Sequence, residues 1–279
     1  MPTITSEDIV RQVESLPAFP QIVIELMADL EDDSASMMTL ARHIERDPII
    51  TGKVLAAGNR LLRHEGWPEA RDVYTAVSLI GFSRVKKIVL AASIADFTVN
   101  FVGKHFHWAH SLAVGIAAQE LALRVNVNPD CALVAGMLHD LGQFWLAYSY
   151  PLEFQQVRLS VEVHGADVCA AEQERFGMDH CEIGRIVAEY WRIPADLVSA
   201  IANHHAQNEK ALTEKIPALT HIADVIVQAL DLPRREFNRV SRISSLACRT
   251  MGINWNDEES IQILGAIDAR YQYASEIFS

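Results

Sequence analysis

The chain has 279 residues, of which 50% are hydrophobic and 22% are charged. This composition is typical of a globular protein and excludes disordered, collagen-like and low-complexity chains. Acidic residues outnumber basic ones by 36 to 24, which gives a net charge of −12. Because proteins that hold a phosphate backbone depend on clustered Lys and Arg, nucleic acid is not expected as a partner.

The N-terminus and the apolar runs indicate neither a leader nor a membrane segment. Residues Met1 to Asp8 lack the basic stretch and apolar core of a signal peptide. The longest apolar runs, such as Ile88–Ala95, are much shorter than the ~20 residues that span a bilayer. The four cysteines form no Cys-x-x-Cys pair, which argues against a zinc ribbon, a thioredoxin-type centre and a disulfide scaffold. We therefore expect a soluble cytoplasmic protein that has no membrane partner.

Helical periodicity dominates the first hundred residues. Ile22, Leu26 and Leu30 recur at intervals of four, which places them on one face of a helix. At Asp47-Pro48, an Asp can cap a helix whose first turn accepts Pro, so a helix is predicted to begin there. The run Val85–Phe97 predicts the last helix of this part of the chain.

The same pattern continues through the rest of the chain. Residues from His105 onward predict a new helix, and Asn128-Pro129 predicts another helix start. Two more helical patterns follow Pro233. No stretch alternates apolar and polar residues beside an Asn-Gly or Asp-Gly turn, so hairpins are not indicated. The predicted fold class is all-α.

A boundary between subdomains is expected near Gly103, because most of the histidines and most of the negative charge lie after it. No Gly/Ser-rich linker separates the two parts, which favours tightly packed subdomains. We expect an N-terminal helical subdomain at residues 9–104, a histidine-bearing helical subdomain at 105–232 and a helical extension at 233–279.

The histidines carry the main chemical signal. His139-Asp140 ends an apolar helix and can present an imidazole and a carboxylate to the same ion, although a single buried histidine is more often structural. One further histidine precedes this pair, and other histidines and a second aspartate follow it, all in apolar helical settings. This donor set suits one or two divalent ions, namely Fe, Mn, Zn, Ni or Mg. The candidate ligands are His110, His139, Asp140, His180, His204, His205 and Asp224.

These positions resemble the metal-binding pattern of the HD superfamily of phosphohydrolases, and His180 with His204-His205 resemble the added ligands of its HD-GYP branch. The N-terminal half resembles the HDOD domain, a bacterial regulatory relative. The resemblance covers about Ile9 to Leu230 and implies an HD-superfamily helical bundle with an N-terminal helical subdomain. The motifs that carry it are Leu16-Pro-Ala-Phe-Pro, Arg46-Asp-Pro-Ile-Ile, Ala57-Gly-Asn, Ala76-Val-Ser-Leu-Ile-Gly-Phe and Trp191-Arg-Ile-Pro.

Three departures separate the chain from the hydrolytic branch. Phe106 stands where the HD-GYP enzymes have a Glu, and the Gly-Tyr-Pro segment after His205 is absent. Gln143 stands where a Lys could hold a phosphate, and an uncharged amide supplies no positive charge. The resemblance therefore implies a signal-transduction module that acts on protein partners. A small phosphorylated ligand is a further candidate partner.

The alternative is a metal-dependent phosphohydrolase, in which a bound metal activates water for attack on a phosphoester. Asp140 is then the candidate catalytic residue and bridges two ions. The first ion takes His110, His139 and Asp224, and the second takes the remaining histidines. His221 lies three residues before Asp224 on the same helical face. It either orients a ligand or is an ordinary surface residue.

Overall fold

The structure is a computed structural model of the 279-residue chain. It describes residues 3–16, 19–28, 37–102, 108–205, 209–233, 240–255 and 258–278. Gly103, His105, Phe106 and the residues that directly follow His205 lie outside these ranges.

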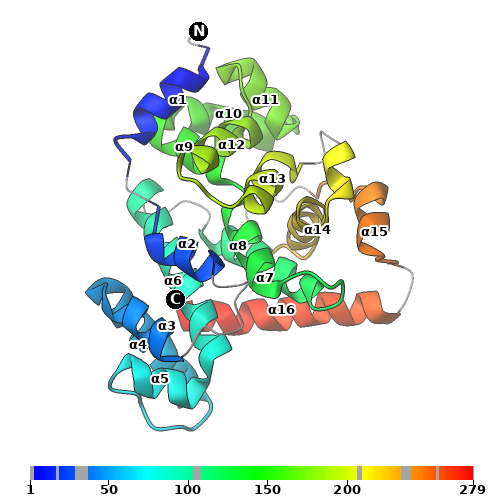
Figure 1. The fold of residues 1–279 in the computed structure, drawn as a ribbon. Helices are drawn as coiled ribbons and strands as arrows, with labels where there is room; N and C mark the ends of the chain where they lie inside the picture. The colour runs from blue at the N-terminus through cyan, green and yellow to red at the C-terminus, as the bar shows by residue number, and fades with distance from the viewer. Residues whose placement is uncertain are drawn as a thin grey trace. The chain divides into compact units, whose positions relative to one another are not determined.

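The described part of the chain is built from helices and contains no strand, so the all-α prediction is confirmed (Figure 1). None of the described helices is both long enough and apolar enough to cross a membrane. The elements in chain order are α1 (Ser6–Val13), α2 (Gln21–Ala28), α3 (Met37–Glu45), α4 (Pro48–His64), α5 (Val73–Ile80), α6 (Phe82–Val102), α7 (Trp108–Ala122), α8 (Pro129–Leu138), α9 (Leu141–Ser149), α10 (Pro151–His164), α11 (Val168–Phe176), α12 (His180–Tyr190), α13 (Ala195–Asn203), the 3-10 helix η2 (Glu209–Thr213), α14 (Lys215–Ala229), α15 (Ser245–Met251) and α16 (Glu258–Phe278).

The chain divides into two compact units. The first comprises Met1–Ala18 and Thr98–Tyr271, and the second comprises Phe19–Phe97 and Gln272–Ser279. All seven candidate ligands belong to the first unit. The expected division into subdomains at 9–104, 105–232 and 233–279 stays a prediction.

In the second unit, short-range motifs determine where helices begin and how a loop is held. Asp47 caps α4 by accepting hydrogen bonds from two backbone amides, and Pro48 takes the first helical position, as predicted. The Asn59 side chain holds the backbone of Ala70 twice, since its Nδ2 donates to the carbonyl (3.0 Å) and its Oδ1 accepts from the amide (2.8 Å). Two of the HDOD-like motifs thus have direct structural roles.

The centre of the first unit is formed by helices that are buried on nearly all sides. Every residue of α7 from His110 to Ala122 is buried, and so is the middle of α14. Apolar residues occupy most positions on all sides of both helices, as expected for the interior of a domain, and the few polar ones are buried with them. Gly115 on α7 and Gly136 on α8 let the two helices approach closely, because a Cβ on Gly136 would lie 2.7 Å from the Gly115 backbone. This close packing brings the beginning of α7 to the end of α8.

Candidate metal centre

The seven candidate ligands come from six helices and converge in the first unit. Most of them lie at helix ends, where the chain changes direction and a side chain can point between helices. The positions are the first turn of α7 (His110), the end of α8 (His139), the start of α9 (Asp140), the start of α12 (His180), the end of α13 (His204 and His205) and the middle of α14 (Asp224).

The first group of donor atoms surrounds one point between α7, α8 and α14. The Nε2 of His110 lies 3.2 Å from Oδ1 of Asp224 and 3.9 Å from Oδ2 of Asp140. The Nε2 of His139 lies 3.2 Å from the same Asp140 oxygen and 3.9 Å from Oδ1 of Asp224. Two imidazole nitrogens and two carboxylate oxygens therefore face each other in a buried position.

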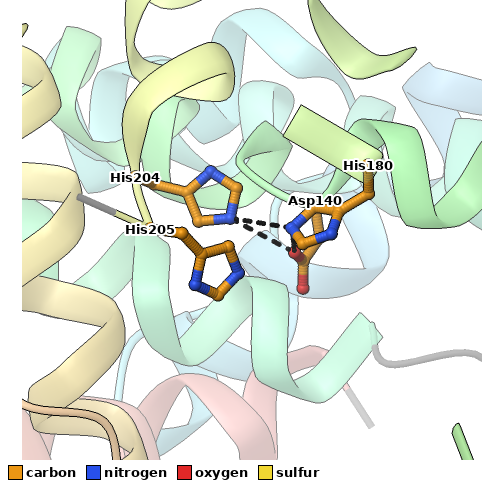
Figure 2. A group of neighbouring side chains, drawn as sticks. All are labelled: Asp140, His180, His204 and His205. Carbon is orange, nitrogen blue, oxygen red and sulfur yellow. Dashed lines mark hydrogen bonds and ion pairs between the residues drawn. The ribbon is translucent and has the colours of Figure 1, made fainter. Parts of the chain in front are cut away.

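The second group uses the other oxygen of Asp140 (Figure 2). The Nε2 atoms of His180 and His204 each lie 3.6 Å from Oδ1 of Asp140. The His205 ring lies beside them, with its centroid 4.8 Å from that of His180 and 4.3 Å from that of His204. The carboxylate of Asp140 thus directs one oxygen to each group.

Hydrogen bonds on the far side of the rings indicate which nitrogens face the centre as acceptors. The Nδ1 of His139 lies 2.7 Å from the carbonyl of Gly136, and the Nδ1 of His204 lies 2.9 Å from that of Ile201. A carbonyl oxygen only accepts, so each Nδ1 carries a hydrogen, and Nε2 is the nitrogen that can bind an ion once it holds no proton.

The Nε2 atoms of His180 and His204 lie 3.2 Å from each other. The Nδ1 of His180 faces a carboxylate and donates to it, so Nε2 is the ring nitrogen left for the centre. Two lone pairs do not face each other at this distance unless a proton or a cation lies between them. The side chains present therefore fit a divalent metal ion.

Glu172 on α11, which was not predicted, holds His180. Its Oε2 accepts hydrogen bonds from the backbone amide of His180 (2.9 Å) and from Nδ1 of the ring (2.5 Å). Both side chains are fully buried. Carboxylates commonly orient metal-binding histidines in this way. The sequence offered only a weak signal, namely that Glu172 shares the buried face of α11 with Cys169 and Phe176.

The charge of Glu172 also changes the proton affinity of His180. Burial by itself disfavours the protonated ring, but the charge and hydrogen bond of Glu172 outweigh this and hold the pKa of His180 well above its usual value. In the metal-free protein, a proton on Nε2 can therefore bridge His180 and His204.

Replacing Glu172 by Gln in the metal-free protein is expected to lower the pKa of His180, since the largest of the charges that oppose the effect of burial is then removed. A raised pKa in the folded state contributes stability below the unfolded value of about 6.5, and this is lost as the pH rises through the folded pKa. The destabilisation caused by Glu172→Gln should therefore shrink as the pH rises. NMR titration of the His180 ring and urea unfolding at several pH values measure both effects.

The matched control for that substitution is Glu174→Gln, because Glu174 is exposed on the same helix. It should leave the His180 titration unchanged. A Glu172→Gln variant whose loss of stability is the same at every pH would contradict the assigned role of the Glu172 charge.

The remaining charges favour the ligand forms of the side chains. Burial by itself would raise the pKa of Asp140 and of Asp224, but the charges and hydrogen bonds of neighbouring histidines hold both well below the usual range. Burial, followed by the charges of neighbouring rings, lowers the pKa of His204 and His205. At neutral pH the two carboxylates are therefore ionised and the rings of His204 and His205 are neutral, which are the forms that bind metal. Against the effect of burial, the charges of Asp140 and Glu172 instead raise the pKa of His139 and of His180, respectively, so an ion that binds there displaces a proton from these rings.

Two glutamines hold the two carboxylates. The Nε2 of Gln143 donates to Oδ1 of Asp140 over 3.1 Å, and the Nε2 of Gln228 donates to Oδ2 of Asp224 over 2.8 Å. Gln143, noted in the sequence as the replacement for a phosphate-binding Lys, thus contacts the shared carboxylate. Gln228 was not predicted, although its position four residues after Asp224 on one helix is a usable signal.

His221 is buried, and its two ring nitrogens are both occupied. The Nδ1 lies 2.7 Å from the carbonyl of His204 and donates to it, whereas the Nε2 accepts from the amide of Ser244 at 3.0 Å. The ring therefore holds the backbone of His204 rather than the carboxylate of Asp224.

Two cysteines form a third cluster with His180. The Sγ atoms of Cys169 and Cys181 and a ring nitrogen of His180 all lie within 4.8 Å of one another. A hydrogen bond with Cys169, together with burial, raises the pKa of the Cys181 thiol well above its usual value. A protonated thiol binds metal less readily than a thiolate, so the cysteines are weaker candidates than the histidines and aspartates.

Sequence comparison identifies the family. The family model of the HDOD domain matches residues 16–207. The chain belongs to the HDOD family. Among curated proteins, this HDOD chain is 21% identical over 205 residues to a protein of Treponema pallidum, and it is 28% identical over 149 residues to ribonuclease Y of the Aster yellows witches'-broom phytoplasma.

The two alignments cover 70% and 52% of the HDOD chain but 38% and 23% of the respective relatives. The chain therefore spans less than half the length of these curated relatives.

Solved structures with the same fold extend over nearly the whole HDOD chain. An HDOD domain protein from Geobacter sulfurreducens matches with a TM-score of 0.72 and 24% identity, over 93% of this chain and 96% of that one. A candidate phosphohydrolase from Shewanella amazonensis gives 0.67 and 20%, over 97% and 98%. A candidate signal transduction protein from Marinobacter aquaeolei gives 0.72 and 19%, over 94% and 60%. These matches establish the HDOD fold.

Proposed function

We propose that this HDOD protein is a signal-transduction module that holds two divalent ions in its core and acts through contacts with other proteins. The observation that carries the proposal is the position of Asp140, whose two carboxylate oxygens face two separate groups of histidines. A carboxylate placed in this way can bridge two ions, with His110, His139 and Asp224 on one side and His180, His204 and His205 on the other.

The donor set narrows the choice of metal. Five imidazoles and two carboxylates favour Fe, Mn or Zn over Mg, which prefers oxygen ligands and keeps several waters. Elemental analysis of protein purified without chelator is expected to find about two ions per chain.

The four thiols are free, which fits a reducing compartment such as the cytoplasm.

A regulatory role is favoured over hydrolysis by the contacts of Gln143. A bound ion would lower the pKa of a coordinated water and polarise a phosphoryl oxygen. Turnover also requires that the developing charge on the phosphate be neutralised. At the position where a Lys could do this, the chain has an uncharged amide, and that amide donates to Asp140. A small phosphorylated ligand could therefore bind at the centre without being cleaved.

The second candidate function is phosphodiester hydrolysis, because two ions that share a carboxylate are also the arrangement of many hydrolases. One relative is named ribonuclease Y, and one structure with this fold is named as a candidate phosphohydrolase. Removal of a single electrostatic contact costs about 10²–10³ in rate. Gln143 and Phe106 argue against phosphodiester hydrolysis, because each stands where the hydrolytic relatives have a charged residue.

An activity assay separates the two functions. The protein is loaded with Mn²⁺ or Fe²⁺, and release of linear product from cyclic di-GMP and of nitrophenol from bis(p-nitrophenyl) phosphate is measured. We expect no turnover above that of the Asp140→Asn variant. Robust hydrolysis that disappears in this variant would establish a phosphohydrolase instead. Loaded protein that binds a phosphorylated ligand without cleaving it would support the regulatory role.

A further inference from the structure

Residues 240–244 form a non-helical segment just before α15. The side chains of Val240, Ser241 and Arg242 are exposed, and the segment contains no helix. Two of its backbone amides are held by side chains of α14. The amide of Ser241 donates to Oε1 of Gln228 over 3.0 Å. The amide of Ser244, which caps α15 through its hydroxyl, donates to Nε2 of His221 over 3.0 Å.

Each of these two acceptors also holds a candidate ligand. Gln228 accepts from the segment through Oε1 and donates to the Asp224 carboxylate through Nε2. His221 accepts from the segment through Nε2, and its Nδ1 donates to the carbonyl of His204. A single side chain therefore separates the segment from each ligand residue.

The two ligand residues belong to different groups of the centre. In the first group Asp224 faces His110, whereas in the second group His204 faces Oδ1 of Asp140. His221, Asp224 and Gln228 lie three and four residues apart, which places them along one face of α14. His221 and Asp224 lie in the buried part of α14, whereas Gln228 is half-buried at its end, towards the exposed segment.

We propose that metal binding at the centre and the ordering of residues 240–251 are coupled through Gln228 and His221. Binding draws Asp224 and His204 into fixed positions, and the two side chains pass this restraint to the amides of Ser241 and Ser244. The ordering of the exposed segment thereby depends on whether metal occupies the buried centre. This inference rests on the proposed function, in which the centre binds divalent ions.

Thermodynamic linkage makes the coupling reciprocal. If metal binding stabilises the segment, then loosening the segment must weaken metal binding by the same factor. Exposed segments with few buried contacts open with small free energies, so a restraint from the centre has a measurable effect there. A purely structural role of the two hydrogen bonds, such as satisfying the amides at the start of α15, would produce no dependence on metal.

The experiment uses the full chain, metal-free and saturated with Mn²⁺. Hydrogen exchange of peptides that cover residues 240–251 is measured in both states, and Mn²⁺ affinity is measured by calorimetry. In the wild type, Mn²⁺ should slow exchange across these residues. In Gln228→Met and His221→Phe, which keep side-chain size, the Mn²⁺ effect on exchange should largely disappear. Their Mn²⁺ affinity should fall by about 10- to 100-fold, as is typical when a residue that orients a ligand is removed.

The control Gln262→Ala, at an exposed position on α16, should leave both quantities unchanged. The conservative change His221→Gln retains a donor and an acceptor and should recover part of the coupling. If the wild type binds Mn²⁺ but exchange at residues 240–251 is unaffected, the coupling is wrong while the proposed function stands. If the wild type binds no Mn²⁺, both are overturned. If either size-matched variant fails to fold, the coupling is tested by comparing hydrogen exchange at residues 240–251 in the metal-free and the Mn²⁺-saturated wild type.

Discussion

Asp140→Asn is expected to abolish metal binding at both positions of the centre, whereas His205→Ala should weaken only one. The reason is geometric, because Asp140 Oδ2 lies beside the His139 ring and Oδ1 lies beside the rings of His180 and His204. An Asn offers one neutral oxygen and one amide group that cannot bind a cation. We therefore expect the stoichiometry to fall from about two ions per chain to none at concentrations that saturate the wild type.

The same substitution should remove the stabilisation that metal confers. A ligand that binds only the folded state adds about 2.7 kcal/mol at a hundred times its Kd. Thermal unfolding is measured with and without Mn²⁺, and the increase in Tm seen in the wild type and in the control variant should be absent from Asp140→Asn. Asp196→Asn, at an exposed position on α13, is the matched control. An Asp140→Asn protein that retains two ions per chain would contradict the bridging arrangement.

Gly142→Ala is expected to produce the largest loss of stability among the substitutions that leave the ligands unchanged. A Cβ at Gly142 would lie 1.9 Å from the carbonyl oxygen of His180 and 2.8 Å from the amide nitrogen of Gly184. These are backbone atoms, so α9 and α12 would have to move apart. Overpacking of a core costs about 1–3 kcal/mol or more. Because Asp140 precedes α9 and His180 begins α12, metal affinity should decrease as well.

Urea unfolding measures this effect, and Gly265→Ala provides the comparison. Gly265 lies within α16, and nothing lies within 4 Å of a Cβ built there. Ala at this position should stabilise the protein by about 0.5–1 kcal/mol, since Gly is unfavourable inside a helix. Equal unfolding midpoints for Gly142→Ala and the wild type would show that α9 and α12 do not approach each other so closely.

Local patterns were sufficient to predict the helical class and several helix starts. Asp47 and Asn128 cap α4 and α8 with Pro in the first turn, as their sequence context indicated. Such caps depend on atoms only two or three residues away, so neighbouring residues determine them. The helix predicted from His105 onward corresponds to α7, which begins at Trp108 in the described residues. His105 itself lies outside them.

The seven candidate ligands were also selected from the sequence, because His-Asp and His-His pairs in apolar surroundings are uncommon and their order resembles that of a known family. The residues that hold those ligands have weaker signals in the sequence. Glu172 and Gln228 are polar residues within helices, and such residues are usually exposed. The Ser244 partner of His221 lies 23 residues away, so no local pattern indicates this contact.

The sequence by itself therefore determined the helices, the family and the set of candidate ligands, since these depend on short-range order along the chain. Only the tertiary structure decided how the ligands are divided. Which oxygen of Asp140 faces which histidine depends on the packing of α7, α8, α9, α12, α13 and α14, and on glycines such as Gly142 that allow backbones to approach. That packing also links the centre to residues 240–244, because hydrogen bonds between distant segments form only once the helices are in place.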